Sequence, residues 1–201
     1  MARDEALFML ILEYADWEPA ILAAGLRRGF GLLEPRYIPR VVGLGPEPVL
    51  SLGGFRALPD YTLDTAPDDF AALILVGGSG WFGREAAGVL PLVRRAAEIM
   101  AVLGGICDGS VFLGVNGFLN EVRHTSNSLS ILRTRGGPAY RGGDKYQADS
   151  QSVRDGNIVT ANGAGFIEFA RDVFTALDVA PAPVIDEVYA ICKTGFFSPA
   201  T

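Results

Sequence analysis

The sequence has few of the residues on which several classes of protein depend. It contains two cysteines, Cys107 and Cys192, and a single histidine, His124. Two cysteines cannot build the disulfide framework of a small secreted protein, and with one histidine they cannot supply an ordinary zinc site. The apolar run 6–12 is too short and too closely flanked by acids for a signal peptide or a membrane span. We therefore predict a cytoplasmic protein without a metal site or a membrane partner.

Positive charge is also scarce. The chain has 17 lysines and arginines against 23 acidic residues, for a net charge of -6, and its basic residues cluster no further than pairs such as Arg27-Arg28 and Arg94-Arg95. Nucleic-acid binding needs a basic patch, so the partners we expect are small molecules or proteins. With 201 residues, of which 49% are hydrophobic, we expect one domain over 1–201 with its core at about 5–195.

The hydrophobic pattern alternates between strands and helices along the chain. It predicts strands at 6–12, 37–44, 71–76 and 102–106, a side hairpin before Asp60, and a hairpin of 152–154 with 158–160. Helices are predicted from Asp16 as N-cap, at 86–101 and 109–115, from near Ser126, and at 165–177 and 184–193. This order indicates an α/β fold with a mainly parallel sheet covered on both faces, and we expect only the tail 196–201 to be loosely held.

The segment Gly105-Ile106-Cys107-Asp108-Gly109 carries the clearest chemical signal. Small residues flank a nucleophile between a predicted strand and a helix, as in a nucleophile elbow, where tight backbone angles leave no room for larger neighbours. A thiol at a helix N-terminus meets the positive end of the helix dipole, so we predict a lowered pKa for Cys107. Cys192 lies in a helical apolar pattern and is interpreted as a core residue.

Two further residues are candidates to act on this thiol. His124 is the only histidine, so any cysteine–histidine mechanism requires it; the alternative is a histidine bonded to nearby backbone. Glu18 follows the first strand and belongs at the same sheet edge as Cys107, although an acid at a helix start needs no catalytic explanation. The glycine-rich loop from Gly78 to Gly83 suits backbone N–H groups that approach a ligand.

Several motifs together resemble the ThiJ/PfpI superfamily, and more narrowly its bacterial branch labelled type 1 glutamine amidotransferase-like. The motifs are Tyr14-Ala15-Asp16-Trp17-Glu18, Ile74-Leu75-Val76-Gly77-Gly78, Gly105-Ile106-Cys107-Asp108-Gly109, Arg123-His124-Thr125-Ser126-Asn127 and Asp155-Gly156-Asn157-Ile158-Val159-Thr160-Ala161-Asn162-Gly163. The resemblance covers nearly the whole chain. It implies a flavodoxin-like three-layer sandwich with a nucleophile elbow, and a homodimer.

The resemblance also implies roles for particular residues. Cys107 would be the nucleophile, Glu18 the acid that hydrogen-bonds its sulfur, and the backbone N–H groups of Gly78 and Asp108 an oxyanion hole. His124 matches the family pattern as a possible base. We name Trp17, Gly77, Ser79 and Thr125 as the residues expected to line the substrate pocket.

These residues favour a cofactor-free enzyme that acts on small reactive carbonyls, as glyoxalase-like and deglycase-like relatives do. Two alternatives stay open: a redox-responsive stress protein that senses oxidation at Cys107, and a cysteine hydrolase or peptidase of the same superfamily. A scaffold that does not need its thiol is a weaker reading. Glutaminase activity is not expected, because no histidine follows His124.

Overall fold

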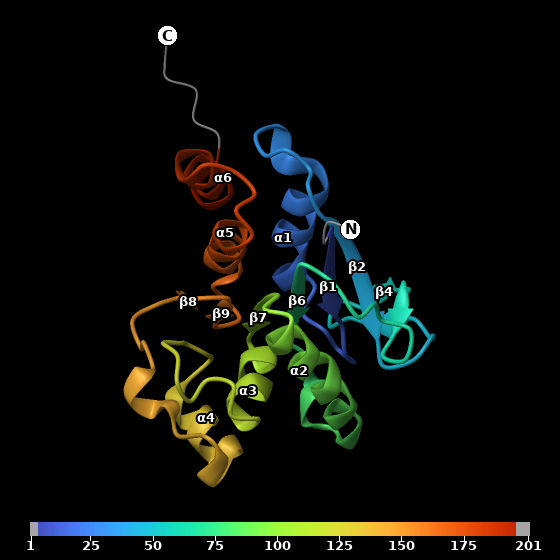
Figure 1. The fold of residues 1–201 in the computed structure, drawn as a ribbon, viewed down its shortest axis with the longest axis vertical. Coiled ribbons are helices and arrows are strands. Elements are labelled where there is room, and N and C mark those ends of the chain that lie inside the picture. The colour runs from blue at the N-terminus through green and yellow to red at the C-terminus, as the bar shows by residue number, and fades with distance from the viewer. Residues whose placement is uncertain (1–3, 196–201) are drawn as a thin grey trace.

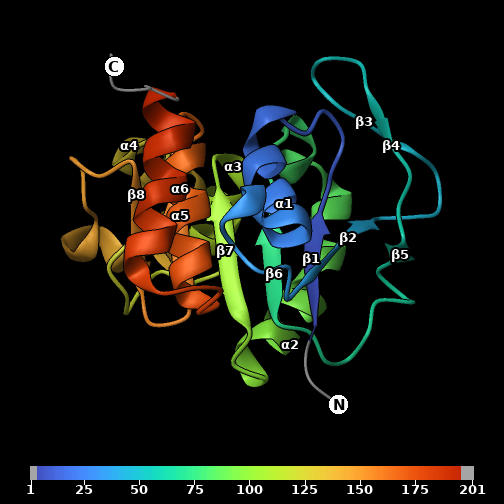
Figure 2. The same ribbon diagram turned by 90° about the horizontal axis from the view of Figure 1, so that it is seen from above.

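The structure is a computed structural model that describes residues 4–195. Within these residues a seven-stranded sheet lies between two layers of helices (Figures 1 and 2). Its strands, in the order β5-β2-β1-β6-β7-β9-β8, are β1 (Glu5–Met9), β2 (Ile38–Gly43), β5 (Tyr61–Thr62), β6 (Ala72–Leu75), β7 (Val102–Ile106), β8 (Ser152–Asp155) and β9 (Ile158–Ala161). Only the β8–β9 pair is antiparallel, so the predicted α/β fold with a mainly parallel sheet is confirmed.

Three helices cover each face of the sheet. One layer consists of α1 (Trp17–Arg28), α5 (Phe166–Ala176) and α6 (Ala182–Thr194); the other consists of α2 (Leu90–Glu98), α3 (Asp108–Val115) and α4 (Leu129–Gly136). Alternate residues of β1 enter the two cores, with Ala6 and Phe8 on the α1 side and Leu7 and Met9 on the α2 side. A strand that is buried on both faces must be continuously apolar, which explains the run in the sequence.

Helix starts differ most from the sequence-based prediction. The segment expected as one helix over 86–101 forms a 3₁₀ helix at Arg84–Val89 and then α2, because Pro91 lacks an N–H donor and is tolerated only in a helix's first turn. The helix expected near Ser126 begins at Leu129, where the hydroxyl of Ser128 accepts a hydrogen bond from the Ile131 amide. The edge strand β5 was missed, because two residues carry no periodic signal.

A short hairpin lies outside the main sheet (Figure 2). It pairs β3 (Val49–Leu50) with β4 (Arg56–Ala57), as the sequence predicts for this region. The Gly53 amide donates a 2.8 Å hydrogen bond to the carboxylate of Asp16 at the start of α1. Asp16 holds the N-cap position but makes no side-chain bond to the helix itself, so its predicted capping role is replaced by attachment of the hairpin.

Two sequence-based expectations concern parts of the chain beyond these elements. The tail 196–201 lies outside the described residues. Within residues 4–195, no helix has both the length and the apolar character that crossing a membrane requires.

Candidate functional site

Cys107 lies at the centre of the sheet, directly after β7, where the carboxyl ends of the parallel strands meet. Its backbone has φ 53° and ψ -124°, a conformation that residues other than glycine rarely adopt. Hydrogen bonds hold this turn: the Cys107 amide donates to the Ala161 carbonyl at 3.0 Å, and the Cys107 carbonyl accepts from the Ser110 hydroxyl at 2.6 Å. The strained elbow predicted from the sequence is therefore present.

The glycine after the elbow allows α3 to approach the sheet closely. A Cβ atom on Gly109 would lie 2.1 Å from the Leu75 carbonyl oxygen, which belongs to the neighbouring strand β6. No side chain can occupy that space without moving backbone. The small-residue pattern thus has a packing cause as well as a conformational one.

Glu18 projects from the first turn of α1 and is 1% exposed. One carboxyl oxygen, Oε2, accepts a 2.7 Å hydrogen bond from the Gly77 amide. The other, Oε1, has no nitrogen or oxygen partner among residues 4–195 and lies beside the Cys107 sulfur. A Cβ atom on Gly163 would contact both groups, at 3.2 Å from Oε1 and 3.1 Å from Sγ. The structure therefore brings Glu18 and Cys107 together.

Asn127 completes this group, although the sequence reasoning did not select it. Its Nδ2 donates to the Cys107 sulfur at 3.1 Å, and its Oδ1 accepts from the Gly163 amide at 3.0 Å. The bond from Gly163 fixes which end of the amide faces the sulfur. Asn127 belongs to the quoted motif around His124, but the sequence does not mark it as a catalytic candidate, because an amide is no base.

Burial controls the protonation of both central groups. It raises the pKa of Glu18 to about 7, against the opposing effect of the Gly77 N–H bond. It also raises the pKa of Cys107 to about 12, which the Asn127 and Asp108 N–H groups only partly offset. The predicted lowering of the Cys107 pKa is therefore wrong, because desolvation and the nearby carboxyls of Glu18 and Asp108 outweigh the N–H groups around the sulfur.

His124 is fully buried and has both ring nitrogens occupied elsewhere. Nδ1 lies 2.8 Å from the Val122 carbonyl, which can only accept, so Nδ1 carries the proton and Nε2 accepts from the Tyr140 hydroxyl at 2.7 Å. Burial lowers the pKa of this histidine, which keeps it neutral. Neither nitrogen is available to Cys107, so the structure does not support the predicted action of His124 on the thiol.

The residues predicted to line the substrate pocket differ in whether their side chains bond to the site around Cys107. Trp17 is attached to the site through its indole N–H, which donates to the Gly163 carbonyl at 3.0 Å, and the residue is 46% exposed. The hydroxyls of Ser79 and Thr125 are bound away from the thiol, to the Glu13 carboxylate at 2.5 Å and the Ser150 carbonyl at 3.2 Å.

The predicted backbone donors lie around the elbow. Gly77 has no room for a side chain, because a Cβ atom there would be 2.6 Å from that of Cys107. The Asp108 backbone N–H lowers the pKa of Cys107, against the larger effect of burial, and Gly78 follows Gly77 directly. Their use as an oxyanion hole stays a prediction. Within residues 4–195, no group of three or more histidine, cysteine, aspartate or glutamate side chains is placed to hold a metal ion.

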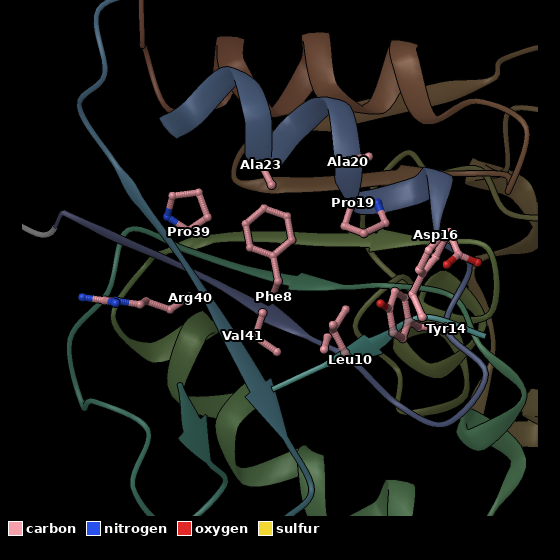
Figure 3. A pocket seen from close by; sticks show the side chains of 12 residues that line it. Phe8, Leu10, Tyr14, Asp16, Pro19, Ala20, Ala23, Pro39, Arg40 and Val41 are labelled. Atoms are coloured by element: carbon pink, nitrogen blue, oxygen red, sulfur yellow. The ribbon is translucent and has the colours of Figure 1, made fainter. Parts of the chain in front are cut away.

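A separate apolar cavity of about 400 Å³ lies between α1, the strands β1 and β2, and the β3–β4 hairpin. Figure 3 shows Phe8 and Val41 on its floor, with Pro19 and Ala23 of α1 above them. Cys107 does not line it. The hairpin segment beside this cavity leaves Phe55 and Leu58 about 70% exposed. The cavity and these two exposed side chains together form an apolar face of the described surface.

Comparisons with known proteins agree with this arrangement. The sequence profile described as the DJ-1/PfpI family matches residues 4–176. An uncharacterized protease of Bacillus subtilis, YdeA, is 31% identical over 193 residues, which is 96% of this chain and 93% of the relative. A second uncharacterized protease of that organism, YoaZ, is 31% identical over 183 residues, 90% of this chain and 86% of its own.

Solved structures are similar over almost the whole length. The DJ-1 superfamily protein Atu0886 from Agrobacterium tumefaciens superposes with a TM-score of 0.83 at 32% identity, covering 94% of this chain and 97% of that one. A thiJ/pfpI family protein from Bacillus anthracis gives a TM-score of 0.87 at 29% identity, covering 96% and 92%.

Proposed function

Because this chain belongs to the DJ-1/PfpI family, we propose that it is a cysteine-dependent enzyme that acts on small reactive carbonyl compounds without a cofactor. The observation that carries this proposal is the contact between the Cys107 thiol and the buried carboxyl of Glu18, at a turn held in a strained conformation. Both cysteines are free thiols in the structure, which suits the reducing cytoplasm where we expect the protein to work.

The first step uses Glu18 as a base. Its carboxylate takes the proton from the Cys107 thiol, and the sulfur forms a bond to the aldehyde carbon as the carbonyl electron pair moves to oxygen. The N–H groups of Gly78 and Asp108 stabilise that oxygen until Glu18 returns the proton to it. A thiol with a raised pKa needs such a base, and Asn127 stabilises the sulfur as negative charge develops.

The later steps move two protons within the bound compound and consume one water. For a 2-oxoaldehyde, Glu18 removes the hydrogen as a proton from the carbon that carries sulfur and delivers it to the neighbouring carbonyl carbon, while the proton of the hydroxyl formed in the first step passes to the neighbouring carbonyl oxygen. This transfer leaves a thioester beside a hydroxyl group. Water then attacks the thioester carbon, the carbon–sulfur bond breaks, and a 2-hydroxy acid leaves with the thiol restored. A carboxyl whose pKa is about 7 can both accept and release a proton near neutral pH.

The test is consumption of methylglyoxal and glyoxal by purified protein without glutathione. We expect turnover in the wild type, none in Cys107→Ser, and turnover within about threefold of wild type in His124→Gln, because the ring nitrogens of His124 are used within the fold. Turnover that survives in Cys107→Ser would contradict the proposal. Loss in His124→Gln, with the protein folded by circular dichroism, would restore the histidine to the mechanism.

A second candidate function is hydrolysis of a peptide or another acyl compound, favoured by the names of the two curated relatives as proteases. The same thiol would form a thioester with loss of an amine. Casein and short fluorogenic peptides, assayed with the same variants, separate this activity from carbonyl turnover. If neither substrate class is turned over and dilute peroxide oxidises Cys107 in folded protein, the redox-sensing alternative is favoured instead.

We further propose that the protein is a homodimer, and that its uncovered apolar face is part of the contact. The support is the exposure of Phe55 and Leu58 beside the 400 Å³ cavity, on a hairpin attached to the start of α1 through Asp16. Light scattering is expected to give the mass of two chains for wild type and of one for Phe55→Asp with Leu58→Asp. A wild-type mass of one chain at micromolar concentration would reject this assembly.

A further inference from the structure

A small cavity beside the elbow helix has an arginine in its wall that the proposed mechanism does not use. The cavity measures about 130 Å³ and lies between the 3₁₀ helix η2 (Ser79–Phe82) and α3. Its lining residues are Trp81, Phe82, Val111, Phe112, Val115 and Arg135. Five of the six are apolar or aromatic, and none is acidic. At about 30 Å³ per water molecule, this space fits a group of a few heavy atoms.

Arg135 is held against an aromatic ring rather than an acid. Its guanidinium carbon lies 4.2 Å from the centroid of the Phe82 ring. Among residues 4–195 it forms no ion pair. Arg133 shares the last turn of α4, where a positive charge complements the helix dipole, but it does not line the cavity. Position on the helix therefore does not account for the contacts of Arg135.

One electrostatic interaction and two polar contacts of Asn127 relate the arginine to the thiol. Its charge acts on the Asp108 carboxyl, which begins α3 immediately after Cys107. Asn127 Nδ2 lies 3.5 Å from that carboxyl and 3.1 Å from the Cys107 sulfur. Val111 and Val115 follow Asp108 by one and two helical turns, so the cavity lies along the α3 face that starts at the elbow.

The carboxyls of Glu18 and Asp108 repel an anionic ligand only when they are ionised. Burial raises the pKa of Glu18 to about 7 and also raises the pKa of Asp108. An arginine guanidinium, in contrast, carries a positive charge in proteins. An anion that enters this cavity thus meets a permanent positive charge set in apolar walls.

We propose that the Arg135 cavity is a subsite for the carboxylate of a small substrate, so that the preferred compounds are short aldehyde acids or keto acids. This inference rests on the proposed function, because it names the class of carbonyl compound that Cys107 would receive. The carboxylate would pair with the guanidinium, and the short carbon chain would contact the valine and phenylalanine side chains of α3.

The test measures alkylation of Cys107 by two reagents that differ mainly in charge. In each, the sulfur displaces iodide from a CH₂ group, so a carbon–sulfur bond forms as the carbon–iodine bond breaks; iodoacetate is an anion and iodoacetamide is neutral. The ratio of their rates at Cys107, from peptide mass spectrometry, cancels any change in the reactivity of the thiol itself. We expect this ratio to fall about fivefold in Arg135→Met.

Arg133→Met is the matched control, since it removes the same charge from the same helix turn outside the cavity. Its ratio should stay near that of wild type, and Arg135→Lys should retain part of the preference. An unchanged ratio in Arg135→Met, or an equal fall in Arg133→Met, would overturn the proposal. If wild type turns over no carbonyl compound and the ratio still falls only in Arg135→Met, the proposed reaction fails while the anion subsite stands.

Discussion

Replacing Glu18 by glutamine is expected to stabilise the protein at pH 8 while it removes most of its activity. Burial raises the pKa of this carboxyl from 4.5 to about 7, so the folded protein bears the cost of an ionised buried group at pH 8. The shift corresponds to about 3 kcal/mol of unfolding free energy. Loss of a general base is expected to lower carbonyl turnover by about 10² to 10⁴. In the wild-type protein, the base that activity requires would thus lower the stability of the fold at pH 8.

The sign of the pH dependence follows from the raised pKa. The contribution of Glu18 to the unfolding free energy is greatest below pH 4.5, where the carboxyl is protonated in both the folded and the unfolded protein. That contribution is lost as the pH rises through about 7. Urea unfolding of wild type and Glu18→Gln should give free energies whose difference grows by about 3 kcal/mol in favour of the variant between pH 4.5 and 8. A change in packing would shift this difference equally at every pH, so its dependence on pH reports the titration of Glu18 alone.

Glu34→Gln serves as the control, because Glu34 is exposed and its charge stays in water. The difference between this variant and wild type should not depend on pH to a comparable extent. A constant difference for Glu18→Gln as well would mean that Glu18 titrates as an ordinary surface acid. That result would remove the physical basis for its action as a base near neutral pH.

Gly109→Ala is expected to destabilise the protein by about 3 kcal/mol, although alanine is a good helix former. The added methyl group would lie 2.1 Å from the Leu75 carbonyl oxygen and 2.8 Å from its carbon. These atoms belong to the backbone of the buried strand β6, so relief requires α3 to move away from the sheet. Because Cys107 is the residue before α3, such a shift would also displace the thiol.

Urea unfolding measures this effect, with Gly45→Ala as the matched control. A Cβ atom on Gly45 would meet nothing within 4 Å, so that variant should lie within about 0.5 kcal/mol of wild type. The rate at which iodoacetamide alkylates Cys107 reports the position of the thiol separately. If Gly109→Ala were as stable as Gly45→Ala, α3 would not be packed on β6 as closely as the structure has it.

The sequence by itself determined the fold class, the order of the long elements and the position of the nucleophile. β7 was predicted with its correct bounds, and the elbow at Cys107 followed from the small residues around it. These features depend on neighbours in the chain: apolar runs identify buried strands, and glycines identify tight turns. The placement of Glu18 beside the thiol followed from the resemblance and from the parallel sheet, which gathers strand ends at one edge.

Only the tertiary structure decided which groups reach the sulfur and what their charges are. His124 and Asn127 are three residues apart in one motif, yet the asparagine bonds the sulfur while the histidine ring bonds Tyr140 and Val122. The pKa of Cys107 is raised rather than lowered, because segments far apart in the chain remove it from water together. Solvation and side-chain partners are products of packing between distant segments, and no local pattern in the sequence specifies them.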